Sequence, residues 1–314
     1  MTRLLTRSDL QAVLEPVSCM AALRDGFRAA ASPIAGQRIR TDLPFPGTAT
    51  ALIPGVLPGI KAYTVKVNAK FPGARPALRG VVCLHSGDDG RLLALMDSAT
   101  ITAWRTGLAA ALGTHLLASP ASAAGSVLGV IGAGAQAELV VHGLSALRRH
   151  REIVIHDSDP DRAHAFASRH DGRLLTSATQ VAAAADIVLL ATWSRSPLLR
   201  LADTRPGQHI TSLGADEPGK QELAADLLES ALLVVDDREL AATTGALSAA
   251  GLAAWAAEAT LSEVLRGDHP GRTRATDRSV YAPVGLPWQD LALAWVAYQQ
   301  AEQHDIGQKI DLLS

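Results

Sequence analysis

Residues 127–137 read VLGVIGAGAQA, an apolar run that leads into two closely spaced glycines and then into a helix-forming segment. Gly132, Gly134 and Ala137 fit the pattern G-x-G-x-x-A, which binds dinucleotides when it joins a strand to a helix. The first glycine permits the tight turn, the second lets the backbone approach a pyrophosphate, and the third small residue lets helix and strand pack closely. The helix amino terminus adds backbone amides and the positive end of its dipole. This stretch therefore predicts a dinucleotide-binding turn.

An acidic residue follows the glycine turn at the position where dinucleotide-binding domains contact the ribose. Asp157 ends the strand expected after the glycine turn, where a carboxylate can bind both hydroxyls of the adenosine ribose. The same charge repels the 2′-phosphate of NADP, and Asp159 and Asp161 add to that repulsion, whereas Arg162 could relieve it. The sequence therefore predicts NAD as the cofactor, with NADP as the alternative.

Strands and helices alternate throughout 119–287, which opens with a short segment of small and polar residues at 119–122. Continuous apolar strands joined by helical crossovers are typical of a parallel sheet covered on both faces. We therefore expect a doubly wound α/β fold of the Rossmann type. The expected strands are 126–131, 152–156, 187–191, 209–213 and 232–235, and the helices between them include 135–148 and 160–168.

The other residues, 1–118 together with 288–314, are expected to form a second α/β domain. A broadly helical apolar rhythm predicts a helix over 8–31, with Ser8 as its cap. An amphipathic helix over 288–304 is expected to pack back onto this domain. The remaining expectations are loops and short edge strands over 33–59, strands at 61–66, 80–84 and 92–96, a turn at 88–90 and a long helix over 98–118.

Composition argues against several classes of protein. The 314 residues are 48% hydrophobic and 19% charged, which fits a globular chain of two domains. The net charge is −2 and the basic residues are scattered, so we expect no nucleic-acid or membrane partner. The two cysteines form no CxxC pair and the ten histidines show no HxH or HExxH spacing, so we expect no metal site. The first residues lack the apolar core of a signal peptide, and no stretch is apolar enough to span a membrane, so a cytoplasmic protein is expected.

Five blocks in chain order resemble the ornithine cyclodeaminase/mu-crystallin family and together cover nearly the whole chain. The resemblance implies a Rossmann domain inserted into an α/β domain that binds substrate and forms a homodimer. It also implies use of NAD(P) on amino or imino acids, by cyclodeamination, by reduction of ketimines or by interconversion of alanine and pyruvate. The blocks are Val65-Lys66 with Phe71-Pro72, Met96-Asp97-Ser98 through Thr102 to Thr106, residues 130–136, residues 213–223, and Asp290-Leu291-Ala292.

The resemblance also implies roles for four residues. Lys66 stands at the spacing from Pro72 of the family's active-site lysine, and Asp216 resembles the acid before its Pro-Gly-Lys segment. A lysine partly desolvated beside arginines can serve as acid or base near neutral pH, while Asp216 could orient an ammonium or activate water. Arg105 and Arg40 resemble the arginines that hold the substrate carboxylate, which a guanidinium binds with two hydrogen bonds. The structural alternatives are helix stabilisation by Arg105 and an Asx turn at Asp216.

Two of these assignments have close competitors, namely Lys61 and Lys70 for Lys66, and Arg38 for Arg40. Two of the cofactor candidates also have structural alternatives. Thr192, which ends an expected strand, could equally cap the backbone. Gly285, assigned by resemblance to the nicotinamide pocket, could be an ordinary loop residue. The full set of cofactor candidates is Thr106, Gly132, Gly134, Ala135, Gln136, Asp157, Thr192, Leu213, Gly214 and Gly285.

One departure from the family pattern bears on the substrate. Ornithine-specific members carry a glutamate just before a Met-Pro pair, where it can help to bind the distal ammonium, whereas this chain reads ALIP over 51–54. We therefore expect an NAD(P)-dependent imino-acid reductase or amino-acid dehydrogenase. Its substrate would be a cyclic ketimine such as pyrroline-2-carboxylate, or a small 2-oxo acid with ammonia. A cyclodeaminase that uses NAD catalytically is the alternative, and a non-catalytic NAD(P)H-binding protein like mu-crystallin is a third.

Overall fold

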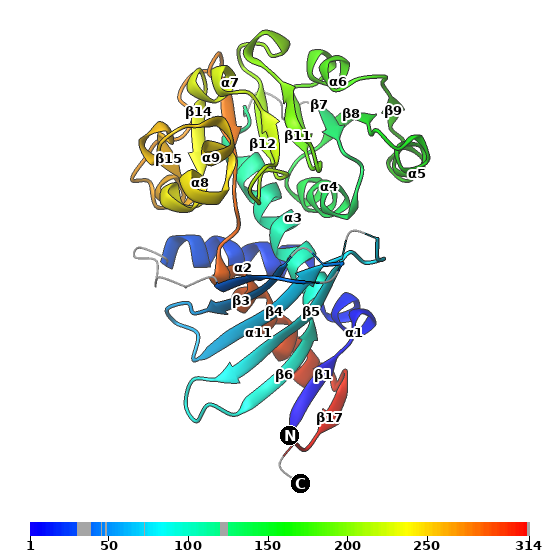
Figure 1. Ribbon diagram of the computed structural model, residues 1–314, viewed down its shortest axis with the longest axis vertical. Coiled ribbons are helices and arrows are strands. Elements are labelled where there is room, and N and C mark those ends of the chain that lie inside the picture. Colours follow the sequence, from blue (N-terminus) through cyan, green and yellow to red (C-terminus); the bar gives the residue numbers. More distant parts are fainter. Residues whose placement is uncertain (30–38, 45, 48, 72, 120–124, 313–314) are drawn as a thin grey trace. The chain divides into compact units, whose positions relative to one another are not determined.

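The computed structural model describes residues 1–29, 39–44, 46–47, 49–71, 73–119 and 125–312. It divides into two compact units: unit 1 comprises Met1–Thr106 and Leu286–Ser314, and unit 2 comprises Gly107–Gly285. Figure 1 shows the helices and strands of both units with the labels used below.

Unit 1 is built on a seven-stranded sheet in the order β17-β1-β6-β5-β4-β3-β2. The neighbours from β2 to β6 pair antiparallel, whereas β1 pairs parallel with β6 and antiparallel with β17. The strands are β1 (Thr2–Leu5), β2 (Ile39–Asp42), β3 (Ala49–Gly55), β4 (Ala62–Lys70), β5 (Leu78–Ser86), β6 (Leu92–Asp97) and β17 (Gln308–Ile310).

The C-terminal helix α11 (Pro287–His304) packs on one face of this sheet and against helix α2 (Pro16–Ala29), as Figure 1 shows, which confirms the expectation for 288–304. A Cβ atom added to Gly26 would lie 2.3 Å from the Trp288 ring, so the absence of a side chain lets the two helices approach closely. The Trp288 ring also meets Phe27 edge to face, with centroids 4.9 Å apart. Along β4, Ala62, Thr64 and Lys66 are buried, so this is the sheet face that α11 covers.

The single helix expected over 8–31 is wrong, because the chain forms two helices there. Helix α1 spans Arg7–Val13 and α2 begins at Pro16. Proline lacks an amide hydrogen and forces the residue before it out of the helical region, so it begins a helix but does not continue one. The cap of α1 is Thr6, whose side chain accepts from the Asp9 amide in a capping box, and not Ser8.

Unit 2 contains an eight-stranded sheet in the order β15-β14-β16-β12-β10-β7-β8-β9, and every pair in it is parallel. This confirms the doubly wound α/β fold. The five expected strands are β7 (Ser126–Ile131), β8 (His150–His156), β10 (Ile187–Leu190), β12 (His209–Ser212) and β14 (Leu232–Val235). The structure adds strands that the sequence did not predict, namely the short strands β9 (Arg173–Leu174), β15 (Ala259–Thr260) and β16 (Ser279–Tyr281), and the separate pair β11 (Arg195–Leu199) and β13 (Gln221–Leu223).

Helices join most of these strands. In unit 2 they are α4 (Ala135–Leu147), α5 (Pro160–His170), α6 (Ala178–Ala184), α7 (Ala225–Glu229), α8 (Arg238–Thr244), α9 (Ala246–Ala250) and α10 (Leu261–Arg266). A continuous apolar core joins the parallel strands to α6, α7, α8 and α9.

The two units divide inside helix α3 (Ser98–Leu117), between Thr106 and Gly107, and not at the small polar segment after residue 118. The second half of α3 belongs with unit 2 because it packs on the parallel sheet. A Cβ on Gly113 would lie 2.3 Å from the Tyr281 ring, and the hydroxyls of Thr114 and Thr211 lie 2.7 Å apart. Small residues therefore set this contact, and a polar linker does not mark the boundary.

Candidate active site

The glycine turn of unit 2 has the geometry that its sequence predicts. Gly132 has φ +90°, and a Cβ there would lie 2.6 Å from the Ala191 carbonyl oxygen, so only glycine fits. Gly134 caps helix α4, and a Cβ on it would meet open space. Ala137 is fully buried where helix and strand pack. The turn thus exposes a helix amino terminus with room beside it.

The two residues that open α4 differ in exposure. Ala135 is exposed, whereas Gln136 is half-buried. Among the described residues, the Gln136 Oε1 atom is buried without a hydrogen-bond partner. An unpaired polar atom beside an open helix terminus fits a site that receives a polar ligand.

Asp157 directly follows β8, and its side chain is 3% exposed. Its Oδ2 atom accepts a hydrogen bond of 2.7 Å from the Ala133 amide, and its Oδ1 atom accepts one of 2.8 Å from the Asp159 amide. The Arg162 guanidinium lies 3.5 Å from Oδ2. The carboxylate therefore shapes the glycine turn, a role that the sequence did not indicate beside the expected ribose contact.

Glu222 of β13 joins the carboxyl ends of β10 and β12. Its Oε1 atom accepts hydrogen bonds from the amide and hydroxyl of Thr192, at 2.6 and 2.7 Å. Its Oε2 atom accepts from the Ser212 hydroxyl at 2.7 Å and from the Gly214 amide at 2.8 Å. Complete burial raises the pKa of Glu222, although these four donors act in the opposite direction. Two cofactor candidates, Thr192 and Gly214, are thus held by one carboxylate.

A second buried carboxylate holds Gly285. Asp236 follows β14, and its Oδ2 atom accepts a hydrogen bond of 2.5 Å from the Gly285 amide. The Val284 amide donates to the same carboxylate at 3.0 Å. Burial raises the pKa of Asp236, and these amides counteract that shift. Gly285 has φ +96°, a conformation that favours glycine.

These residues of unit 2 follow the carboxyl ends of parallel strands, the edge at which open α/β sheets bind ligands. Leu213, the remaining cofactor candidate of unit 2, is buried there and donates its amide to the Leu190 carbonyl. Asp216 lies in the same loop, with its side chain 37% exposed. Lys220 Nζ lies 2.8 Å from the Asp216 carboxylate and 4.2 Å from the centre of the Trp193 ring.

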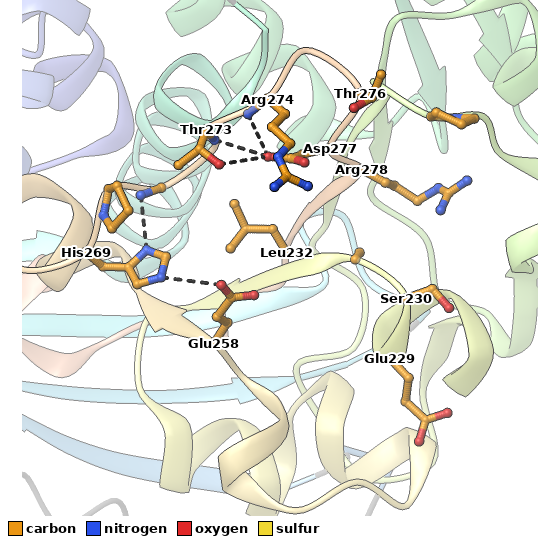
Figure 2. Close-up of a pocket in the computed structure, with 14 residues that line it drawn as sticks. Glu229, Ser230, Leu232, Glu258, His269, Thr273, Arg274, Thr276, Asp277 and Arg278 are labelled. Carbon is orange, nitrogen blue, oxygen red and sulfur yellow. Dashed lines mark hydrogen bonds and ion pairs between the residues drawn. The ribbon is translucent and has the colours of Figure 1, made fainter.

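A polar hollow of about 540 Å³ lies elsewhere in unit 2, as Figure 2 shows. Leu232, which lines it, begins β14, and Arg278 directly precedes β16. The hollow therefore lies at the amino ends of the parallel strands, and the cofactor candidates lie at their carboxyl ends. His269 and Glu258 form an ion pair of 3.5 Å in its wall.

Unit 1 brings three charged side chains into one buried cluster. Lys66 is 1% exposed, and its Nζ atom lies 2.6 Å from Asp290 Oδ2 and 3.5 Å from the Thr102 hydroxyl. Arg105 Nε lies 3.5 Å from Asp290 Oδ1. The competitor Lys61 is exposed, so burial favours Lys66 as the functional lysine.

Asp290 received no role from the sequence, although it belongs to a block that matches the family. The available signal was an acidic residue in the first turn of helix α11, directly before the apolar run at 291–297. The sequence contains no comparable signal for Glu222 and Asp236. Their role is to accept hydrogen bonds from backbone amides, and only the fold brings those amides close to them.

Arg40 stands apart from the buried cluster. It lies on the edge strand β2, is exposed, and forms an ion pair of 3.3 Å with Asp42. The strand register aligns Arg40 with Ala51 and then with Asn68, two residues beyond Lys66, so Arg40 shares the sheet face of Lys66. Its competitor Arg38 lies outside the described residues, and Thr106 is half-buried on α3.

Within the described ranges, no three or more histidine, cysteine, aspartate or glutamate side chains gather to hold a metal ion. In the same part of the chain, no helix is long and apolar enough to cross a membrane.

The chain is similar to known proteins over nearly its whole length. A family model for the ornithine cyclodeaminase/mu-crystallin family matches residues 2–305. The chain is 31% identical over 320 residues to the alanine dehydrogenase of Archaeoglobus fulgidus, with 98% of each chain covered. Its fold is similar to that of an archaeal alanine dehydrogenase dimer with bound NAD, at 29% identity, a TM-score of 0.89 and 99% coverage of each chain. It is also similar to Thermococcus litoralis Delta(1)-pyrroline-2-carboxylate reductase in complex with NADH and L-proline, at 25% identity and a TM-score of 0.90, covering 98% of this chain and 100% of that one. The chain therefore belongs to the ornithine cyclodeaminase/mu-crystallin family.

Proposed function

We propose that the chain is an NAD(P)-dependent oxidoreductase that reduces a small imino acid or oxidises the corresponding amino acid, with NAD as the favoured cofactor. The observation that carries the proposal is the buried cluster of Lys66, Arg105 and Asp290 in unit 1. It offers a proton-transferring amine and a guanidinium for a carboxylate, the two groups that such a substrate needs. The names of the relatives support the same class of reaction.

The residues of unit 2 fit a dinucleotide. The space beside Gly134 leaves room for the pyrophosphate at the start of α4, where backbone amides can donate to it. Asp157 would contact the ribose, while Thr192, Gly214 and their neighbours would line the nicotinamide end. When bound, the cofactor supplies or accepts the hydride.

Unit 1 supplies the substrate contacts in this proposal. Arg105, with Arg40 as a second arginine, binds the carboxylate and fixes the imine carbon relative to the hydride. Reduction adds a hydride to that carbon and a proton to the nitrogen, and Lys66 provides the proton. Asp216 orients the ammonium product or, with a linear substrate, a water molecule.

The test is NADH oxidation with a panel of imino acids and 2-oxo acids plus ammonia, followed at the absorbance of reduced nicotinamide. Stoichiometric loss of NADH with pyrroline-2-carboxylate or pyruvate, abolished in Lys66→Ala, is the expected result. Ammonia release from ornithine with catalytic NAD would indicate a cyclodeaminase instead. Position 51 argues against that outcome, because alanine stands where ornithine-specific members have a carboxylate. NAD(P)H binding without turnover, unchanged by Lys66→Ala, would indicate a binding protein.

We further infer that the chain forms a homodimer in the cytoplasm, through the sheet face of unit 1 that α11 leaves uncovered. This face exposes apolar side chains on neighbouring strands, namely Ile39, Leu52, Val67 and Val81. An apolar sheet face of this kind is typical of an interface between subunits, and the archaeal relative is a dimer. Light scattering should give twice the chain mass, and Val67→Lys with Val81→Lys should give the monomer mass. A wild-type monomer would contradict the inference.

A further inference from the structure

We propose that Asp290 is a positioning residue that couples Lys66 to Arg105, holding the lysine as an ammonium and leaving the arginine open to one substrate carboxylate. The proposal rests on the proposed function. It adds Asp290 to the site in unit 1 and requires that its carboxylate be charged. The coupling of Asp290 to Lys66 exists without substrate, so it can be tested without turnover.

The burial of Asp290 requires partners. The residue is 2% exposed, and its place in the first turn of α11 puts its negative charge near the positive end of the helix dipole. A buried carboxylate remains charged only when cations or hydrogen-bond donors compensate for the lost water. Lys66, on β4, meets it at 2.6 Å, the distance of a short charge-assisted hydrogen bond.

The contact with Arg105 is different. Arg105 Nε and Asp290 Oδ1 are 3.5 Å apart, and within the described part of the chain both atoms are buried without a hydrogen-bond partner. The other contact of this guanidinium is long as well, at 3.4 Å from NH1 to Gln289 Oε1. A buried guanidinium with an unused donor is ready to receive a carboxylate ligand.

The formal charges of the cluster also favour a carboxylate ligand. The cluster contains two cations and one anion, so its net charge is +1, which one substrate carboxylate neutralises. Within the sheet, Lys66 aligns with two apolar residues, Ile53 on β3 and Val82 on β5. Arg40 shares the sheet face but is paired with Asp42. The formal charges of Lys66, Arg105 and Asp290 therefore favour a substrate that brings a carboxylate to Arg105.

The chain offers a direct readout of Lys66. It contains only five lysines, at 61, 66, 70, 220 and 309, so lysine labelled with ¹³C at Cε gives five assignable signals. Lys66→Arg identifies the Lys66 signal, and its shift with pH reports the loss of the proton. We expect Asp290→Asn to move that titration to lower pH by about one to three units, because an opposite charge has been removed.

A matched control lies on the same helix. Glu302 of α11 forms a 2.6 Å ion pair with the buried Arg3. Glu302→Gln removes a carboxylate from a buried cation without touching Lys66, so it should leave the Lys66 signal unchanged. Asp290→Glu retains the charge but displaces its oxygen atoms. It should preserve most of the titration while lowering kcat, and it serves as the second variant should Asp290→Asn fold poorly.

Steady-state kinetics then distinguish a positioning role of Asp290 from a general loss of active protein. In Asp290→Asn we expect kcat to fall at least tenfold while KM for the imino acid stays the same or falls, because both cations become available to the carboxylate. The alkaline limb of the kcat profile should move to lower pH. An unchanged Lys66 titration, or a rise in KM with an unshifted pH profile, would overturn the proposal. Failure of the wild type to turn over any substrate would contradict the proposed function alone, because the titration tests the Asp290–Lys66 coupling without catalysis.

Discussion

Glu222 accepts a hydrogen bond of 2.8 Å from the Gly214 amide, and a Cβ atom on Gly214 would lie 2.4 Å from the same carboxylate. The same Cβ would lie 2.4 Å from the Thr192 carbonyl oxygen, so glycine is required by its close contacts with Glu222 and Thr192 and not by an unusual backbone angle. Since the other carboxylate oxygen holds Thr192, the ends of β10 and β12 are fixed together.

Replacement of Glu222 by glutamine should loosen both strand ends. Glutamine keeps one acceptor oxygen but directs an NH2 group at the backbone amides, so about 1 to 3 kcal/mol of unfolding free energy should be lost. NAD affinity, measured by calorimetry, should fall as well. Glu229→Gln, at an exposed position in the same unit, is the control. Unchanged NAD affinity and stability in Glu222→Gln would show that the hydrogen bonds of Glu222 do not hold the two strand ends in the arrangement that NAD binding needs.

Acid should destabilise unit 2 through the buried His209 and the half-buried His150. Burial and the nearby Arg272 and Arg148 guanidinium groups lower the pKa of His209 well below its usual value, and burial lowers the pKa of His150 to about 4. Both are neutral in the folded protein, and the unfolded chain binds their protons below about pH 6.5. Stability should therefore be full above pH 6.5 and decrease as the pH falls toward 5, by up to about 1.4 kcal/mol per pH unit for each histidine.

Urea denaturation at pH 7.5, 6.0 and 5.0 measures this slope. His209 lies 2.9 Å from the hydroxyls of Ser279 and Thr211. His209→Gln can preserve a hydrogen bond there without titrating, so it should flatten the pH dependence even if it lowers stability overall. The same slope in that variant would contradict this explanation.

Lys220 should govern the action of Asp216. Lys220→Met removes the cation 2.8 Å from the carboxylate and retains an apolar chain against Trp193. We expect kcat to fall about tenfold, a part of the roughly 10²- to 10⁴-fold that a positioned acid–base group contributes, with little change in NAD affinity. Lys309→Met removes a lysine from an i,i+4 pair of the same spacing at the surface of unit 1 and should leave kcat unchanged. Equal effects of the two variants would exclude a specific role for Lys220.

Asp157 should determine cofactor preference. Asp157→Asn retains an acceptor for the Ala133 amide but removes the charge, and Arg162 then faces the ribose with less compensation. The ratio of kcat/KM for NADH over NADPH should fall about tenfold, which corresponds to about 1.4 kcal/mol. If the wild type already favours NADPH, the assignment of Asp157 as the discriminating charge is wrong.

The sequence was most informative where function depends on backbone geometry. The glycine turn could be predicted because its whole motif lies within one short stretch of chain, from the strand through Gly132 and Gly134 to Ala137. The contact that excludes a side chain at Gly132 comes from Ala191, far along the chain, and only the fold shows it. The Lys66 assignment came from family spacing, and the structure adds its burial. The break at Pro16 was missed, although it could have been predicted because proline acts locally on the chain.

The three buried carboxylates could not be predicted in the same way. Asp290 lies far along the chain from Lys66, and Asp236 likewise from Gly285, so no local pattern links these partners. Glu222 lies close in sequence to Gly214, yet its hydrogen bonds to Thr192 depend on how two parallel strands are placed. Such residues are recognised only once the fold has supplied their partners.

The Arg105 Nε atom, which is buried without a hydrogen-bond partner among the described residues, also makes folding and ligand binding interdependent. A buried polar group without a partner costs roughly 1 to 3 kcal/mol, which the empty protein bears and a carboxylate bound at Arg105 would relieve. Any small carboxylic acid that reaches this position should raise the unfolding temperature with its concentration, whether or not it can be reduced. Substrate in the cell would then set not only the rate of this enzyme but also the fraction of its molecules that stay folded.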